Sequence, residues 1–187
     1  MARAAPAWLT SRETIYLMLG LKHGVNVLVD YDPQWPSDFA AEKQRLQGVL
    51  GDLVLGIEHG GSTSVPGLRA KPILDIYVGI RSLDDWIKCK APLEALGYDY
   101  AEHAAIPNDF VFGRGRDKTE RTHLIHVIEY GGELWRNALA FRDALRTDPA
   151  LAAEYVAIKE QAAAQAPVNR ARYNDLKGPF IAAALAR

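Results

Sequence analysis

Short apolar runs alternate with segments of helical periodicity along the first two thirds of the chain. Runs rich in valine, isoleucine and leucine that end at glycine, proline or aspartate are typical of β-strands. The run at 72–80 is apolar on both faces around Asp75, which favours a central strand covered on both sides. Strands are therefore predicted at 25–31, 53–58, 72–80, 98–101, 110–113 and 122–129.

Helices are predicted between these strands and throughout the last third of the chain. The evidence is apolar residues at helical spacing, together with capping and stop residues at the segment ends. The predicted helices cover 12–20, 36–50, 82–96, 133–146, 148–165 and a last segment from 169 that Gly178-Pro179 kinks or breaks. This order predicts an α/β (α+β) fold, in which helices pack on a mixed β-sheet and form a helical C-terminal layer.

The turn between the second and third predicted strands carries residues suited to binding an anion. Two successive glycines, Gly60 and Gly61, allow a tight bend and a close approach of the backbone to a ligand. Backbone amides and hydroxyls in such a bend bind anions, typically phosphate, and basic residues follow it directly. The residues expected to contact the anion are Gly61, Ser62, Thr63, Ser64, Arg69 and Lys71.

Asp75 follows this turn inside the apolar run 73–78. A carboxylate in such a run is costly unless it is paired, hydrogen-bonded or bound to a metal. An acid at this place can hold a divalent cation, such as Mg²⁺, against bound phosphates. A structural interpretation stays open beside this one, in which the turn only connects two strands and backbone amides satisfy Asp75.

Several segments, in order along the chain, resemble the GrpB (UPF0157) family. They are 31–36 (YDPQWP), 59–75 (HGGSTSVPGLRAKPILD), 106–107 (IP), 122–127 (THLIHV), 141–146 (FRDALR), 155–159 (YVAIK) and 173–177 (YNDLK). The resemblance covers residues 25–187 and implies one domain of nucleotidyltransferase-like fold. Residues 1–24 fall outside it and are expected to form an N-terminal extension.

The resemblance implies a Gly-Ser turn at Gly61-Ser62 and a metal-binding acid at Asp75. Nucleotidyltransferases place a second acid two positions further along the strand, on the same face, but Tyr77 stands there in this chain. Tyrosine is a poor magnesium ligand, so the usual two-metal arrangement lacks one of its acids. The third acid is unplaced, with Glu58 and Glu129 as candidates.

The resemblance also assigns His126, Tyr173 and Lys177 to the site. His123 and His126 are three residues apart on one predicted strand and therefore face opposite sides of the sheet. They cannot both bind one metal from a regular strand, so one is expected to be structural. His126 is the one assigned to the site, as a catalytic residue beside Asp75.

Composition limits the classes of partner. The formal net charge is −1 and the pI is about 6.5, so no overall positive field favours nucleic acid or an anionic membrane. Cys89 is the single cysteine, which excludes an intrachain disulfide. Arg12 and Glu13 interrupt the N-terminal segment before an apolar stretch forms, so no secretory signal is expected, and a cytoplasmic location is predicted.

Three functions remain open from the sequence. The first is an enzyme that binds a nucleotide or another phosphorylated small molecule and transfers a nucleotidyl or phosphoryl group with a divalent metal on Asp75. The second is a non-catalytic domain that binds an anionic small molecule and has lost the second metal-binding acid, with Tyr77 in its place. The third is a protein-interaction domain that uses the helical tail. The resemblance also associates such domains with dephospho-CoA kinase, to which similar domains are fused.

Overall fold

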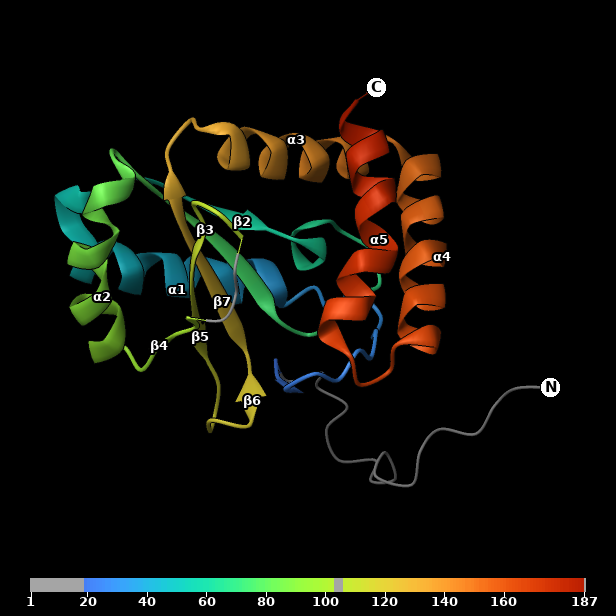
Figure 1. The fold of residues 1–187 in the computed structure, drawn as a ribbon, viewed down its shortest axis with the longest axis horizontal. Helices are drawn as coiled ribbons and strands as arrows, with labels where there is room; N and C mark the ends of the chain where they lie inside the picture. The colour runs from blue at the N-terminus through green and yellow to red at the C-terminus, as the bar shows by residue number, and fades with distance from the viewer. Residues whose placement is uncertain (1–18, 103–105, 187) are drawn as a thin grey trace.

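The computed structural model describes residues 19–102 and 106–186, and its centre is a mixed five-stranded sheet (Figure 1). The strand order is β2-β3-β7-β5-β4, in which β3 and β7 are parallel and the other neighbours are antiparallel. The strands are β2 (Val54–Gly60), β3 (Leu74–Ile80), β4 (Asp99–Tyr100), β5 (Phe110–Arg114) and β7 (His123–Glu129).

One face of this sheet carries the main hydrophobic core. Along β3, the residues Leu74, Ile76, Val78 and Ile80 alternate with outward residues and are all fully buried. They pack in one cluster with side chains of α1 (Trp35–Leu50) and α2 (Trp86–Ala95). Because side chains alternate between the faces of a strand, Asp75 and Tyr77 point to the opposite face.

Three helices form the layer beside that opposite face (Figure 1). They are α3 (Glu133–Thr147), α4 (Pro149–Gln165) and α5 (Arg170–Leu185). Asp148 caps α4 by accepting hydrogen bonds from the backbone amides of Ala150 and Leu151, and Pro149 stands at its first position. Among the described residues, no helix is both long and apolar enough to cross a lipid bilayer.

Short elements complete the chain. A two-stranded sheet pairs β1 (Leu21–Lys22) with β6 (Glu120–Arg121). Single 3-10 turns lie at η2 (Gly51–Leu53), η3 (Ser62–Ser64) and η4 (Leu83–Asp85). The first of these joins α1 to β2, and η3 forms the bend between β2 and β3 that the sequence singles out.

The predicted mixed α/β fold with a helical C-terminal layer is confirmed, but the predicted strand at 25–31 is wrong. In that segment only Val29 forms a β-bridge, with Ala70. The backbone oxygens of Val25 and Leu28 accept hydrogen bonds from the side chains of Arg170 and Arg69 instead of from a neighbouring strand. The segment therefore connects the sheet to the helical layer.

The predicted break at Gly178-Pro179 is also wrong, because α5 continues through both residues to Leu185. Proline removes one hydrogen bond from a helix interior, and packing has to compensate for it. Phe180, directly after the proline, stacks on Tyr155 of α4 with ring centroids 5.6 Å apart. The predicted helix at 12–20 lies, up to residue 18, outside the described residues.

Candidate anion-binding pocket

The glycine turn and Asp75 meet at one end of the sheet. Gly60 pairs with Asp75 in the β2–β3 register, and Gly61 follows with φ 61° and ψ −171°, a conformation that is nearly restricted to glycine. A Cβ atom at Gly61 would lie 2.1 Å from Oδ2 of Asp75. The bend therefore has to be glycine, and it passes directly against the carboxylate.

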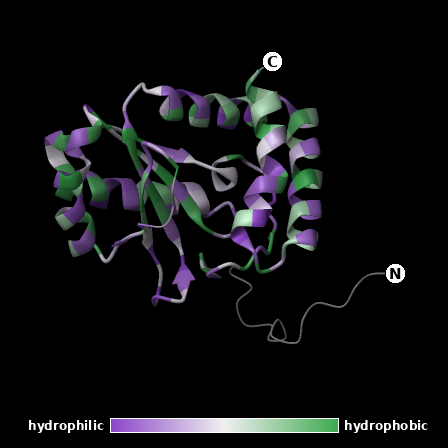
Figure 2. Cartoon of the chain, in the orientation of Figure 1, coloured by the Kyte–Doolittle hydropathy of each residue, from purple (hydrophilic) through white to green (hydrophobic). Residues whose placement is uncertain are grey.

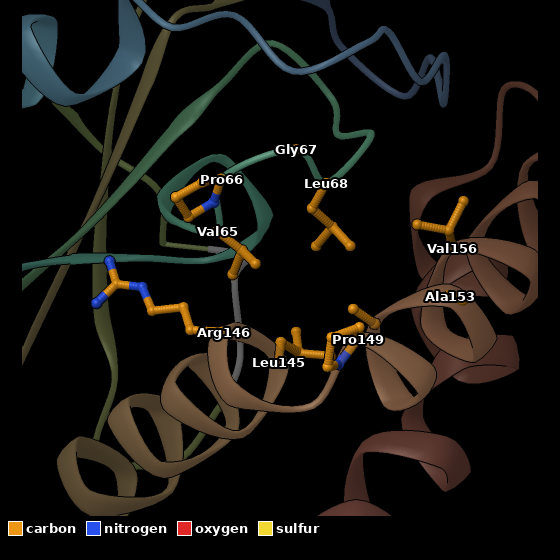
Figure 3. A pocket seen from close by; sticks show the side chains of 10 residues that line it. Val65, Pro66, Gly67, Leu68, Leu145, Arg146, Pro149, Ala153 and Val156 are labelled. Carbon is orange, nitrogen blue, oxygen red and sulfur yellow. The ribbon is translucent and has the colours of Figure 1, made fainter.

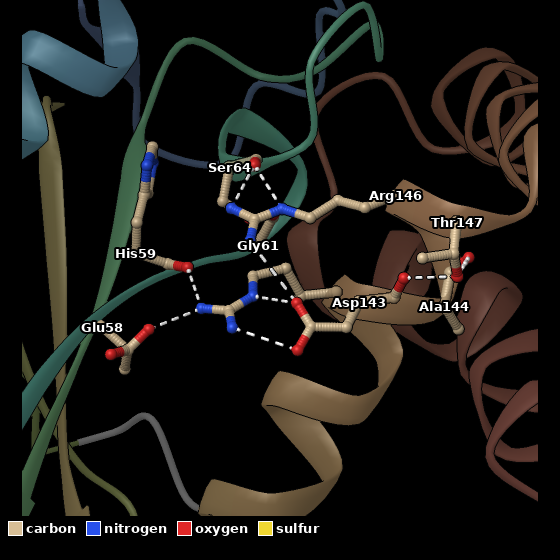
Figure 4. A network of polar contacts seen from close by, with 9 residues as sticks. Glu58, His59, Gly61, Ser64, Asp143, Ala144, Arg146 and Thr147 are labelled. Atoms are coloured by element: carbon tan, nitrogen blue, oxygen red, sulfur yellow. Dashed lines mark hydrogen bonds and ion pairs between the residues drawn. The ribbon is translucent and has the colours of Figure 1, made fainter.

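Two arginines of α3 hold this bend in place (Figure 4). Arg142 donates hydrogen bonds to the Glu58 carboxylate (2.7 Å) and to the backbone oxygen of His59 (3.1 Å). Arg146 donates two to the backbone oxygen of Ser64, at 2.7 and 3.1 Å. Since Arg142 engages Glu58, this acid is part of the scaffold and not a free metal ligand.

The three hydroxyls of the turn have different partners. Ser64 donates to the backbone oxygen of Gly61, and Thr63 donates to that of Ile73 while it also contacts the ring of His59. Ser62 instead accepts a hydrogen bond from Nζ of Lys159. The hydrogen bonds of Thr63 and Ser64 thus give them a role within the turn, and Ser62 is the hydroxyl joined to the helical layer.

A pocket of about 1130 Å³ lies between this face of the sheet and the helices α3, α4 and α5. Although the chain has a net charge of −1, basic side chains outnumber acidic ones among the described residues that line the pocket. They are Lys22, Lys71, Arg121, Arg142, Lys159, Arg170 and Lys177, against Asp75, Asp109 and Asp175. Basic side chains are therefore concentrated in this pocket.

His126 lies between two carboxylates on the floor of the pocket. Its Nδ1 is 2.8 Å from Oδ2 of Asp109, and its Nε2 is 3.9 Å from Oδ1 of Asp75. Burial alone would lower the pKa of His126, but the hydrogen bond to Asp109 and the charge of Asp75 raise it to about 10. At neutral pH the ring is thus an imidazolium that donates a hydrogen bond to Asp109 and forms a longer ion pair with Asp75.

The same contacts keep Asp75 ionised. Burial would raise the pKa of its carboxyl group, but the positive charges of His126 and Lys71 hold the pKa below its usual value. Tyr77 completes the group, since its ring stacks on that of His126 with centroids 4.9 Å apart. The structure therefore brings together Asp75, Tyr77 and His126, as the sequence predicts.

Four basic residues form an inner group, here called the basic cluster: Lys71, Lys159, Arg170 and Lys177. Burial, followed by the charges of Arg170 and Lys177, lowers the pKa of Lys71 to about 6. Burial, followed by the charge of Lys177, lowers the pKa of Lys159 to about 7. The Nε atom of Arg170 is buried without a hydrogen-bond partner. An anion in the pocket would relieve this repulsion and supply that partner.

Tyr173 supports the basic cluster from α5. Its buried ring lies 4.4 Å from Nζ of Lys71 and 5.4 Å from Nζ of Lys177. The face of a tyrosine ring attracts cations, so it helps to hold both lysines at the pocket. Arg69, in contrast, does not line the pocket. It pairs with Asp30 at 2.9 Å and with Glu160 of α4.

The donor groups do not fit the two-metal site implied by the nucleotidyltransferase resemblance. Magnesium prefers oxygen ligands, usually one or two carboxylates plus phosphates. The Tyr77 ring occupies the position of the second acid, and Asp109, the other carboxylate nearby, is bound to His126. Within residues 19–102 and 106–186, no group of three His, Cys, Asp or Glu side chains is placed to hold a metal.

His123 lies on the opposite face of the sheet, as the strand alternation predicts. It is buried, contacts the Thr122 hydroxyl at 2.8 Å and approaches Arg114, which is bound to Glu42 of α1. Burial and the charge of Arg114 lower the pKa of His123 to about 4. This histidine is therefore neutral and belongs to the structural contacts beneath α1 and α2.

A second, smaller hollow of about 500 Å³ lies between the turn and the α3–α4 corner (Figure 3). Its walls are mainly apolar and include Val65, Leu68 and Val156. Arg146, the charged residue among its lining, is already bound to the backbone of Ser64. The hollow thus offers little chemistry compared with the larger pocket.

Three polar residues were not identified from the sequence as part of the site: Asp109, Lys159 and Arg170. A usable signal existed for Lys159, because it lies four residues after Tyr155 on the buried face of an alanine-rich helix. A lysine on an apolar face is unusual unless it is paired or functional. Asp109 and Arg170 lie just before β5 and at the start of α5, where no sequence pattern points to a role.

The fold and the pocket define a mixed α/β domain with a basic pocket on one face of its sheet. The comparisons with known proteins agree with the sequence resemblance, because the family model described as GrpB protein matches residues 26–187. The chain belongs to the GrpB family.

Relatives of different lengths share this region. The glutamate-rich protein GrpB of Alkalihalophilus pseudofirmus is 35% identical, and the alignment covers 88% of this chain and 96% of the relative. The UPF0157 protein YqkA of Bacillus subtilis is 36% identical, with 86% and 46% covered. A dephospho-CoA kinase of Mycobacterium tuberculosis is 31% identical, with 82% and 44% covered. The chain thus spans nearly all of the first relative and less than half of the other two.

A solved structure has the same fold. The crystal structure of the conserved protein GrpB from Enterococcus faecalis superposes with a TM-score of 0.74 at 32% sequence identity. The match covers 86% of this chain and 98% of that chain. The sheet and the helical layer that enclose the pocket therefore belong to a fold that the family shares.

Proposed function

We propose that this GrpB-family chain binds a phosphorylated small molecule, with nucleotides among the candidates, through its phosphate group in the large pocket. The observation that carries the proposal is the basic cluster. Like charges repel and buried ammonium groups are costly, so this arrangement destabilises the free protein. A bound polyanion turns each of these unfavourable contacts into a charge-assisted hydrogen bond.

Each cation has a distinct place around the phosphate. Lys159 reaches it from α4 beside the Ser62 hydroxyl, to which it donates a hydrogen bond of 3.2 Å. Lys71 approaches from the strand side, and Lys177 and Arg170 approach from α5. Asp75 balances part of their charge in the free protein, since it raises the pKa of Lys71 against the lowering effect of the other cations.

Binding without group transfer is favoured over the enzyme interpretation. The ring of Tyr77 stacks on His126, and His126 is held as an imidazolium between Asp75 and Asp109, so it is no base at neutral pH. Among the described residues, Tyr77 stands where a second acid would share a magnesium with Asp75, and the nearby Asp109 is bound to His126. The enzyme interpretation requires turnover of a nucleotide with magnesium, and its detection would overturn the binding-only version.

Calorimetry on the full chain tests the proposal with pyrophosphate, ATP and dephospho-CoA, each with and without magnesium. The last compound is included because one relative is a dephospho-CoA kinase. Lys177→Met should weaken binding about 10- to 100-fold, which is the usual effect of removing a charged hydrogen bond. Lys90→Met on α2, outside the pocket lining, is the matched control and should leave the affinity unchanged.

Two outcomes contradict the proposal. The first is that none of the three compounds binds the wild-type chain. The second is that Lys177→Met and Lys90→Met have the same affinity as the wild type, which would place the anion outside the basic cluster. Affinity that requires magnesium, and that Tyr77→Asp increases, would instead restore the metal-dependent version.

A further inference from the structure

Helix α5, which forms one wall of the pocket, changes character along its length. Its first half (RARYNDLK) is polar and its second half (GPFIAAAL) is apolar. Figure 2 shows this change from hydrophilic to hydrophobic colours toward the C-terminus. Arg170 and Lys177 line the pocket from the first half, and Ile181 and Leu185 line it from the second. The pocket therefore continues past the basic cluster into an apolar region.

The strand and helix that face α5 follow the same order. Along β7, the pocket-lining residues are Leu124, His126 and then the apolar Ile128. Beyond the end of β7, α3 crosses that end of the pocket and contributes Leu134 and Phe141 (Figure 1). Here, the apolar end is defined by Ile128, Leu134, Phe141, Ile181 and Leu185.

Among the described residues, the apolar end contains no unpaired charged side chain, and part of its hydrocarbon surface is exposed. Arg142, the charged lining residue of α3, is bound to Glu58 and Asp143. Leu134 and Leu185 are outside the hydrophobic core clusters formed by the described residues, and Leu185 is 36% exposed. Both leucines line the same pocket, and neither packs into a core cluster of the described residues. Leucines in this situation mark a surface that an apolar group covers.

We infer that the ligand is amphiphilic, with a phosphate at the basic cluster and an apolar chain or ring that lies against Leu134 and Leu185. This inference rests on the proposed function and adds the chemical class of the remainder of the ligand. Lys177 and Leu185 are eight residues apart on α5, which corresponds to about 12 Å along the helix axis. The apolar group extends over that distance, along α5 and toward α3.

A homologous series of n-alkyl phosphates, from methyl to decyl phosphate, tests the inference by calorimetry at constant pH and salt, below the concentration at which the longer members form micelles. Each methylene that leaves water for the apolar end should tighten binding about fourfold, which corresponds to about 0.8 kcal/mol. Leu134→Asn and Leu185→Asn should reduce this dependence on chain length and leave the affinity for methyl phosphate unchanged. Lys177→Met should weaken all members of the series by a similar factor.

The control is Ile87→Asn on α2, an exposed apolar residue outside the pocket, which should leave the whole series unchanged. Equal affinity for methyl and decyl phosphate would overturn this inference while the proposed phosphate site stands. The same conclusion follows if chain length matters but neither leucine variant reduces the effect. If neither inorganic phosphate nor any alkyl phosphate binds, the proposed function fails and this inference fails with it.

Discussion

Replacing Lys159 by methionine should make the free protein more stable while it weakens anion binding. Lys159 is 2% exposed, and its ammonium group contacts the Ser62 hydroxyl and the backbone oxygen of Arg69. No carboxylate is among these hydrogen-bond partners. Methionine has a similar length and flexibility but carries no charge, so it fills the same space without the cost of burying an ammonium group.

The size of the effect follows from the pKa of Lys159. Burial and the charge of Lys177 lower it from 10.5 to about 7, so the charged form destabilises the folded state by about 5 kcal/mol below pH 7. This destabilisation declines as the pH rises toward 10.5, where the unfolded chain also loses the proton. At pH 9.5 it is about 1 kcal/mol. The two lost hydrogen bonds offset part of the gain, by about 1 kcal/mol each.

Urea unfolding of the wild type and Lys159→Met at pH 6 and pH 9.5 measures this difference. The stability advantage of the variant should be about 3 to 4 kcal/mol larger at pH 6 than at pH 9.5. The contribution of the lost hydrogen bonds cancels from this comparison, because the variant lacks them at both pH values. A variant that is less stable than the wild type at pH 6, or an advantage that does not depend on pH, would refute the view that Lys159 is a strained, functional cation.

Three further predictions concern the scaffold of the site. Gly61→Ala should destabilise the protein by more than 2 kcal/mol in urea unfolding, because the backbone angles at this position suit only glycine and the new Cβ would overlap with Asp75. The control Gly67→Ala, at φ 78° with open space around it, should cost about 1 kcal/mol. Equal losses of stability in the two variants would contradict the close contact between Gly61 and Asp75. Asp109→Asn should lower the pKa of His126 in an NMR titration, and an unchanged value would exclude the hydrogen bond as its cause. Burial lowers the pKa of His59 to about 4, below its unfolded value of 6.5, so stability should fall as the pH falls from 6.5 to 4. His59→Gln should reduce that pH dependence, and an equal dependence in this variant would assign it to other groups.

The sequence predicts the sheet well because its strands carry regular apolar patterns. The run around Asp75 is apolar on both sides, and it is the strand that pairs with both β2 and β7 at the centre of the sheet. The prediction was wrong at 25–31, where the valine-rich pattern is typical of a strand but no strand forms. In that segment side chains of distant arginines satisfy the backbone, and such long-range hydrogen bonds leave no periodic pattern in the sequence.

The sequence predicts the parts of the candidate site that one continuous segment forms. It does not predict the parts that depend on the packing of distant segments. Glycines followed by hydroxyls and an acid indicate a bend against a carboxylate, and Gly61 and Asp75 are in contact as predicted. Arg69 follows the same bend, but its guanidinium turns to Asp30 and Glu160 instead. The role of Lys159 depends on how α4 docks against the turn 97 residues earlier in the chain, as its hydrogen bond to Ser62 shows.

The origin of the basic cluster has a consequence for how the molecule assembles. Lys71 comes from the segment that leads into β3, whereas Lys159, Arg170 and Lys177 come from the α4–α5 hairpin. Closing the hairpin over the sheet thus brings charges of one sign together, and apolar contacts such as the stacking of Phe180 on Tyr155 have to overcome that repulsion. If a phosphate binds as proposed, it would offset this repulsion and favour the closed position of the α4–α5 hairpin over the sheet.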